Sequence, residues 1–146
     1  MIHYGKNDIL QTMLTKVDVR VYWDSIAPGI WEIKNISDPD WKPEDIYAAL
    51  LNNVAELYID IDEDPCESFI ILQEKLNIFM PTKSFLIWIA YDKRGGAASK
   101  YMAHLEKMAK ERGCNKIEFW TPHRRLAQSL ESIDYETKLY VVEKKI

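Results

Sequence analysis

The sequence has little that would crosslink the chain or place it in a membrane. Only two cysteines, Cys66 and Cys114, occur in 146 residues, and they do not form a CxxC pair. This count excludes a zinc site built on paired cysteines and argues against a disulfide framework at this chain length. The longest apolar run, near Phe85–Tyr91, is far too short to span a bilayer, and no signal peptide is recognisable. We therefore expect a cytoplasmic protein with reduced thiols.

An excess of positive charge is also missing. The 19 Lys and Arg residues are outnumbered by 23 Asp and Glu residues, which gives a net charge of −4. General nucleic-acid binders and polybasic membrane anchors carry the opposite balance, so we expect neither class. No group of His, Cys, Asp and Glu has the spacing of metal ligands, and Asp60–Asp64 lacks the glycine of a calcium loop. We therefore expect no metal site.

What is present is the composition of a globular domain. Hydrophobic residues make up 47% of the chain and charged residues 29%, which is ordinary for a protein with one well-packed core. A length of 146 residues is enough for one such core. Because no repeat, low-complexity segment or linker interrupts the sequence, residues 1–146 are expected to form a single domain.

The first forty residues give weak signals for secondary structure. Residues 1–4 could form a strand, and apolar residues at helical spacing predict a helix over residues 7–16. The sequence Ala27-Pro28-Gly29 predicts a turn. Residues 30–36 fit either a helix or a strand, and the conformation of residues 18–40 is left open.

From residue 43 onward the apolar pattern separates helices from strands. Pro43 fits the first turn of a helix, and Asn52-Asn53 ends it. Three strands in an antiparallel meander are expected next, followed by a helix, a strand, a helix and a strand, at Val54–Ile61, Cys66–Leu76, Phe85–Tyr91, Ala97–Arg112, Lys116–Trp120, Arg124–Ile133 and Tyr135–Val142. The alternating second half favours a parallel strand pair joined by a crossover helix. We therefore predict an α/β (α+β) fold with a mixed, mostly antiparallel twisted sheet and helices on both faces.

The turn after Phe85–Tyr91 has the residues of an anion site. It reads Asp92-Lys93-Arg94-Gly95-Gly96 and leads into a helix. The first N–H groups of a helix have no partner within it, and together with the helix dipole they attract anions. Since Lys93 and Arg94 add positive charge, the turn is predicted to cradle a phosphate. The alternative is an ordinary tight turn with two solvated basic residues.

This loop and the order of elements resemble those of GNAT-type N-acetyltransferases. The family's loop follows the fourth strand and reads Gln or Arg, two residues, Gly, one residue, then Gly or Ala; here Lys93 takes the first place. The resemblance covers about Trp41–Ile146 and implies that backbone N–H groups of the loop bind the pyrophosphate of acetyl-coenzyme A. The cofactor-binding residues that it implies are Ile89, Tyr91, Lys93, Arg94, Gly95, Gly96, Ala97 and Ala98.

Two positions depart from the family's pattern. The family's Asn near the end of the fifth strand is missing from Phe119–Pro122, and the position of the Tyr that protonates the departing thiolate is Leu130. Other residues would then have to move protons, a contribution of about 10²–10⁴-fold in rate. Backbone N–H groups at Ile89–Tyr91 would polarise the thioester carbonyl. The candidate bases, acting through water, are Glu67, Asp60 and Tyr58, and the candidate acids are Tyr91, His123 and Tyr135.

Two functions remain open on the sequence. The first is an acetyl-coenzyme A-dependent N-acyltransferase that acts on an amine of a small molecule or a protein. The second is a catalytically silent GNAT-like scaffold for protein contacts or homo-oligomer formation. The stretch Trp41–Leu50 is also similar to acetyltransferase-like proteins of tailed bacteriophages, which would place the scaffold in the host cytoplasm or the virion. Leu130 favours the second function, and Gly95-Gly96 favours the first.

Overall fold

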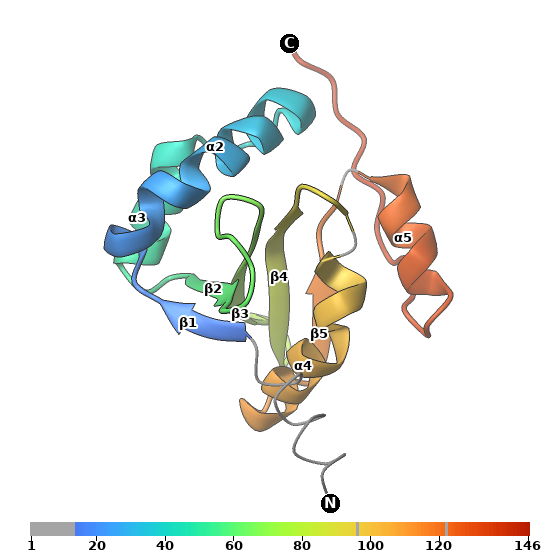
Figure 1. Cartoon of the computed structure of the whole chain (residues 1–146). Helices are drawn as coiled ribbons and strands as arrows, with labels where there is room; N and C mark the ends of the chain where they lie inside the picture. Colours follow the sequence, from blue (N-terminus) through green and yellow to red (C-terminus); the bar gives the residue numbers. More distant parts are fainter. Residues whose placement is uncertain (1–13, 96, 122) are drawn as a thin grey trace, which may run out of the picture.

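The computed structural model describes residues 14–95, 97–121 and 123–146. It shows one five-stranded sheet with helices packed around it (Figure 1). In chain order the elements are β1 (Leu14–Val17), α2 (Val19–Ser37), α3 (Pro43–Leu51), β2 (Glu56–Asp60), β3 (Ser68–Leu76), β4 (Lys83–Asp92), α4 (Ala97–Glu111), β5 (Lys116–Phe119) and α5 (Arg124–Glu131). The strands lie in the order β1-β2-β3-β4-β5. The first three pairs are antiparallel and the pair β4–β5 is parallel, so the predicted mixed, mostly antiparallel sheet is confirmed.

Helices cover both faces of this sheet, as predicted. On one face α2 and α3 bury Ile26, Ile30 and Ile46 against the strands. On the other face α4 buries Tyr101 and Leu105. Because neighbouring strand residues point to opposite faces, each strand contributes side chains to both apolar layers.

The strands and helices predicted after residue 43 are found within two residues of their expected ends, with one exception. Residues 135–142 form no strand; they run extended and mostly exposed to solvent. The N–H of Tyr135 donates to the Leu130 carbonyl at 3.1 Å, and the Tyr135 ring packs edge-on against Phe119, the last residue of β5, at 5.9 Å. The chain therefore arrives beside the end of β5, and the residues that follow leave the sheet (Figure 1).

Helix α2 corrects the expectations for the first third of the chain. It includes Ala27-Pro28-Gly29, so the predicted turn is wrong, and it shows that residues 30–36 are helical. Its start is capped by Asp18, whose carboxylate accepts the N–H of Arg20 at 2.9 Å. Proline inside a helix removes one hydrogen bond. That loss is offset because the buried face of α2 packs against the sheet.

The predicted helix over residues 7–16 is wrong in the part that the structure describes. Residues 14–16 belong to β1, which pairs antiparallel with β2 from Leu14 beside Asp60 to Val17 beside Leu57. Backbone pairing along the edge of the sheet therefore prevails over the local apolar spacing. Residues 7–13, and the strand predicted at residues 1–4, lie outside the described residues.

Strand β4 has an irregularity in its pairing with β3, and its second half is unpaired on the side of β5. Ile87 pairs with Leu72 of β3, whereas Ile89 pairs with Ile71, so Trp88 is an extra residue in the ladder. The pairing of β4 with β5 ends at Ile87 beside Phe119. Among the described residues no strand pairs with residues 89–92 on the side of β5. The two parallel strands therefore part just before the loop that leads into α4.

Candidate functional site

The loop between β4 and α4 is held in a defined turn by its own residues. The Asp92 carboxylate accepts the N–H of Arg94 at 2.9 Å, and the Asp92 carbonyl accepts the N–H of Gly95 at 2.9 Å. Gly95 has φ of +81°, a left-handed value that glycine adopts without strain. This turn places the start of α4 beside the carboxyl end of β4. The first N–H groups of this 15-residue helix have no acceptor within the helix and favour an anion.

Parts of the predicted loop cannot be placed. Gly96 lies outside the described residues, and so do the side chains of Ala97 and Ala98, whose backbone begins α4. A Cβ built on Gly95 would meet no heavy atom within 4 Å. The outer side of the loop is therefore open at this residue, which fits the approach of a bulky anion.

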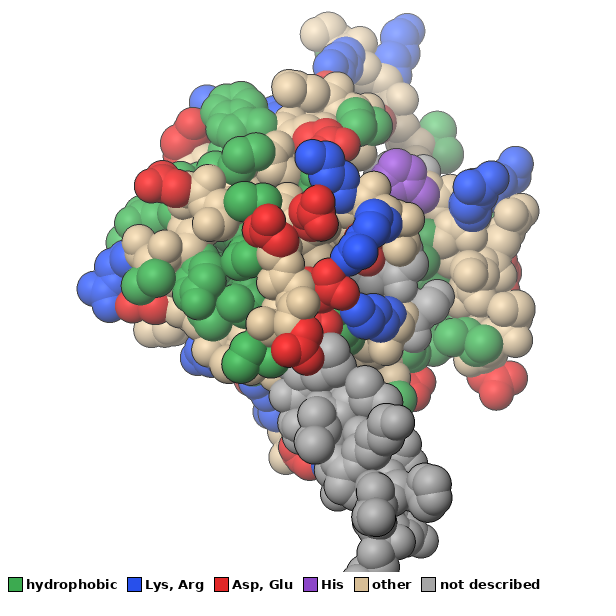
Figure 2. All heavy atoms as spheres, viewed as in Figure 1, with side chains coloured by type: hydrophobic (Ala, Val, Ile, Leu, Met, Phe, Trp, Pro, Cys, Tyr) green, Lys and Arg blue, Asp and Glu red, His purple; other side chains and the backbone are tan. Residues whose placement is uncertain are grey.

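Basic side chains at the loop are partly neutralised from within the protein. The Arg94 guanidinium pairs with the Glu63 carboxylate, and the Lys100 ammonium lies 2.9 Å from the other Glu63 oxygen. Hydrogen bonds from Lys100 and Arg94 lower the pKa of Glu63. Figure 2 shows acidic and basic side chains intermixed over this face of the molecule. Lys93, like Arg94 and Lys100, is exposed.

Glu63 is a site residue that sequence reasoning missed. It is 31 residues from Arg94 and 37 from Lys100, so no local motif joins it to the loop. In the sequence it stands in an acidic turn before β3, where a solvated carboxylate is the usual interpretation. Glu63 reaches Arg94 and Lys100 because the meander brings the carboxyl ends of β2 and β4 to the same end of the sheet.

Beneath these ion pairs lies a buried polar pair. Asp60 at the end of β2 is almost fully buried and accepts a hydrogen bond from the Tyr101 hydroxyl. Burial raises the pKa of Tyr101 to about 12, and the hydrogen bond to Asp60 adds to the shift. Lys100 lies 3.5 Å from the same carboxylate. Asp60 was a candidate base; its place in this pair gives it a structural task, the attachment of the first turns of α4 to the sheet.

Tyr91 lies on the opposite face of the sheet, below α2. Its hydroxyl donates to Glu32 Oε2 at 2.5 Å, and its ring stacks on Phe69 at 5.0 Å between centroids. Burial, and then the bond to Glu32, raises the pKa of Tyr91 to about 12. The phenol is therefore protonated at neutral pH and can act as a proton donor. Ile89 is buried on the same face.

Glu67 lies beside Tyr91 at the same edge of the sheet. Its carbonyl accepts the N–H of Lys93 at 2.8 Å, which places it across from the start of the loop. Its charge contributes to the raised pKa of Tyr91. The structure thus brings two predicted site residues together and adds Glu32, which sequence reasoning missed. A helix prediction for α2 would have found it, because Glu32 is one turn after Gly29, the residue that contacts Tyr91.

Tyr58, a candidate base, lies on β2, where its hydroxyl donates to Glu56 and accepts from Arg112, and the other two candidates lie near α5. His123 precedes the first residue of α5, is exposed, and makes no side-chain cap hydrogen bond. Among the described residues no hydrogen bond or ion pair joins it to Glu67 or Tyr91. The Tyr135 hydroxyl lies 2.8 Å from the Met102 sulfur, and burial raises its pKa. His123 and Tyr135 are therefore not part of the Glu67–Tyr91 group.

Leu130 has an apolar role. It is buried in α5, where it forms a small cluster with Met102, and Phe119, Leu126 and Tyr135 pack against that cluster. This position, at which the family carries a proton-donating Tyr, is occupied by a residue that only packs. Tyr91 itself belongs to the part of β4 beyond Ile87, where the pairing with β5 has ended.

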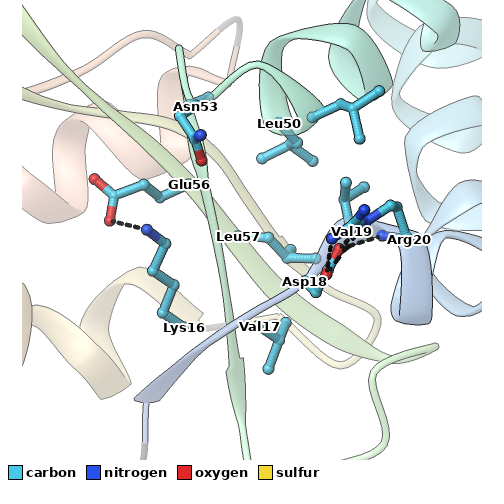
Figure 3. Close-up of a pocket in the computed structure, with 11 residues that line it drawn as sticks. Lys16, Val17, Asp18, Val19, Arg20, Leu50, Asn53, Glu56 and Leu57 are labelled. Atoms are coloured by element: carbon cyan, nitrogen blue, oxygen red, sulfur yellow. Dashed lines mark hydrogen bonds and ion pairs between the residues drawn. The ribbon is translucent and has the colours of Figure 1, made fainter.

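A cavity of about 430 Å³ lies elsewhere, between β1, β2, the start of α2 and the end of α3 (Figure 3). Its charged residues are already paired with one another or with their neighbours. Lys16 lies 3.7 Å from Glu56, and Arg20 lies 2.8 Å from Asp18. None of the predicted site residues lines it. The cavity is therefore not the site indicated by the loop and by β4.

Within residues 14–95, 97–121 and 123–146, no group of three or more His, Cys, Asp and Glu side chains could hold a metal ion. No helix in the same part of the chain has the length and apolar character needed to cross a bilayer.

Comparison with known proteins identifies the fold. No family model and no curated protein sequence matches this chain. Solved structures do match. A ribosomal-protein-alanine N-acetyltransferase from Brucella melitensis biovar Abortus 2308 is 16% identical with a TM-score of 0.67, and the match covers 91% of this chain and 99% of that chain.

Two other neighbours extend the comparison. An aminoglycoside acetyltransferase from an uncultured soil metagenomic sample, in complex with sisomicin, is 9% identical with a TM-score of 0.64 and coverage of 91% and 93%. A Trypanosoma brucei acetyltransferase is 8% identical with a TM-score of 0.62 and coverage of 91% and 98%. The chain therefore has the GNAT-like acetyltransferase fold. Identities this low show the fold and not the activity.

Proposed function

We propose that this protein binds coenzyme A and transfers an acetyl group from acetyl-coenzyme A to an amine. The single observation that carries the proposal is the backbone at the end of β4. Residues 89–92 pair only with β3 among the described residues, the loop turns at Gly95 with a positive φ, and α4 then presents its first N–H groups. Structural neighbours that are acetyltransferases support the same assignment.

The residues of this chain fit such a cofactor. The pyrophosphate would be held by N–H groups at the start of α4 and by the charge of Lys93, while backbone groups of Ile89–Tyr91 would hold the acyl carbonyl. The N–H groups of Arg94 and Gly95 already donate to Asp92, so the helix start supplies the free donors. When bound, acetyl-coenzyme A would supply an activated acyl group.

The protein's own part in the chemistry is proton transfer and orientation. Glu67, which lies beside Tyr91, would take a proton from the attacking amine through water, and the protonated Tyr91 phenol would give a proton to the thiolate that leaves when the acyl group passes to the amine. Glu32 holds the Tyr91 hydroxyl in one orientation at 2.5 Å. Two carboxylates beside one phenol also favour a cationic acceptor, because opposite charges attract across a partly desolvated edge.

The second candidate function is a catalytically silent scaffold that keeps the fold. The observation in its favour is the buried, apolar Leu130 at the family's proton-donor position. The neighbours give no support to a bacteriophage or virion origin for this scaffold. We also propose that the protein is cytoplasmic and that the acceptor amine belongs to a small molecule or a protein.

The test is thiol release from acetyl-coenzyme A in the presence of a panel of polyamines, aminoglycosides and peptide N-termini. We expect amine-dependent release that falls at least about tenfold in kcat for Tyr91→Phe, with Tyr22→Phe as a matched control on α2. Binding of coenzyme A without turnover on any amine would favour the silent scaffold. Absence of both binding and turnover would reject the proposal.

Glu63→Gln is expected to raise the affinity for coenzyme A. The change removes the carboxylate that pairs with both Arg94 and Lys100, so the Arg94 guanidinium becomes free for phosphate oxygens, while Lys100 keeps the Asp60 carboxylate as a partner at 3.5 Å. At low ionic strength we expect a gain of roughly three- to tenfold, and a smaller gain at high salt because exposed charges are screened. Calorimetric titration at two salt concentrations measures it.

The control for this variant is Glu44→Gln, which removes an exposed carboxylate in the first turn of α3, outside the loop and its partners. It should leave the affinity unchanged. Equal or weaker binding by Glu63→Gln, in a chain that binds coenzyme A, would show that the Glu63 carboxylate does not compete with the phosphates.

A further inference from the structure

A second cavity, of about 380 Å³, lies between α2 and α3. The two helices pack against each other on one face of the sheet (Figure 1). Five side chains line the cavity, and none of them belongs to the site at the end of β4. They are Arg20, Trp23, Asp24, Glu44 and Tyr47. Each helix therefore contributes one aromatic ring and one carboxylate.

Helical spacing explains why these side chains meet. Residues three or four apart lie on one face of a helix, and Trp23 and Asp24 follow Arg20 by three and four residues on α2. Glu44 and Tyr47 are three apart on α3. The Trp23 and Tyr47 rings lie 5.0 Å apart between centroids, at an angle of 71°. They form an aromatic corner that packs against the core on one side, and because both rings are only half-buried, part of each faces the cavity.

The charges around the aromatic corner are not balanced. The Arg20 guanidinium is engaged elsewhere, since its Nη2 donates to Asp18 Oδ2 at 2.8 Å and its Nε donates to Asp18 Oδ1 at 3.1 Å. Among the described residues no ion pair joins Asp24 or Glu44 to a Lys or Arg. Glu44 also lies in the first turn of α3, where the helix dipole favours a negative charge. Two uncompensated carboxylates therefore border two aromatic rings.

We propose that the aromatic corner binds an alkylated ammonium group, such as a trimethylammonium group. The face of a Trp or Tyr ring attracts a cation, and the carboxylates of Asp24 and Glu44 add to the attraction and repel anions. A primary ammonium is strongly hydrated and gives up its water only for hydrogen-bond acceptors, which ring faces do not provide. Methyl groups reduce this hydration and pack on the rings, while the positive charge remains.

The proposal is tested by calorimetric titration of the full chain, without coenzyme A, with choline and with its uncharged carbon isostere, dimethylbutanol. We expect saturable binding of choline at millimolar concentration. The isostere should bind at least about tenfold more weakly, because it has the same shape and lacks the charge that the rings and carboxylates attract. Higher salt should weaken choline binding, since the carboxylates are exposed.

Variants of the lining separate the rings from the charges. Trp23→Leu should weaken choline binding at least about fivefold, and Trp23→Phe, which keeps a ring, should weaken it less. Asp24→Asn, at an exposed position, should weaken it roughly two- to fivefold at low salt. Glu44→Gln should do the same while its affinity for coenzyme A stays that of the wild type. The matched control is Asp40→Asn, an exposed position outside the lining, which should bind choline unchanged.

Two further probes distinguish the sources of such a group. Competition with choline by a peptide that contains trimethyl-lysine would assign the site to a protein side chain, and competition by phosphatidylcholine vesicles would assign it to a lipid headgroup. The proposal is overturned if the folded wild type shows no saturable binding of millimolar choline, if choline and dimethylbutanol bind equally, or if Trp23→Leu and Asp24→Asn both bind choline as the wild type does. Thermal unfolding verifies that each variant is folded, because Trp23 packs against the core. None of these readouts depends on acetyl transfer.

Discussion

Asp60→Ala is expected to lower the free energy of unfolding by about 3 kcal/mol. The Asp60 side chain is buried and accepts the hydroxyl of Tyr101, which is itself 4% exposed. It also accepts the N–H of Asp62 at 2.9 Å. With alanine at this position a buried hydroxyl and a backbone donor lose their acceptor. The contribution of Lys100 to this loss is small, since its side chain is 44% exposed.

Urea denaturation of a double-mutant cycle measures this effect. Tyr101→Phe should cost about 1 kcal/mol, since it removes the hydroxyl but leaves Asp60 with its other partners. The double variant Asp60→Ala/Tyr101→Phe should be more stable than the sum of the two losses predicts, because no orphaned hydroxyl remains. Strict additivity, or a loss below about 0.5 kcal/mol for Asp60→Ala, would show that the pair does not attach α4 to the sheet.

Gly29→Ala is expected to destabilise the protein by about 1–2 kcal/mol, although the same change inside an exposed helix stabilises by up to about 1 kcal/mol. The sign reverses because α2 approaches the sheet closely at this residue. A Cβ on Gly29 would lie 2.9 Å from Phe69 Cε1 and 3.0 Å from Tyr91 Cε2. Both rings are buried and stacked, so neither can move away without loss of packing.

A smaller residue at Phe69 provides the control for Gly29→Ala. In a Phe69→Leu background the alanine methyl loses its closest neighbour and keeps the Tyr91 ring at 3.0 Å, so Gly29→Ala should cost less than it does in the wild type. The comparison is made from the free energy of unfolding of four chains in urea. If Gly29→Ala stabilises the wild-type background as it would an exposed helix, α2 does not pack against Phe69 and Tyr91 as described.

The second half of the chain could be predicted from its sequence because local signals and burial agree there. Pro43 begins a helix, β3 is apolar on both faces, and Gly95 adopts the positive φ that glycine favours. The loop between β4 and α4 was found for the same reason. Its chemistry depends on a turn and a helix start, both of which are local features.

The parts that could not be predicted depend on contacts across the fold. Pro28 and Gly29 have the local preferences of a turn, and only the packing of α2 on Phe69 makes them helical. Glu63 reaches Arg94 across 31 residues. The strand predicted at Tyr135–Val142 has the right composition, but among the described residues no strand pairs with it. In each case tertiary packing or a missing partner, and not local propensity, decides the structure.

The central claim is that the start of α4 binds coenzyme A. The most direct measurement is calorimetric titration of coenzyme A into the wild type and into Gly96→Glu, with thermal unfolding to verify that both chains are folded. We expect saturable binding by the wild type below millimolar concentration, and at least a tenfold loss in Gly96→Glu because a carboxylate would repel the phosphates at the helix start. No binding by the folded wild type at millimolar coenzyme A, or equal binding by the two chains, would contradict the claim.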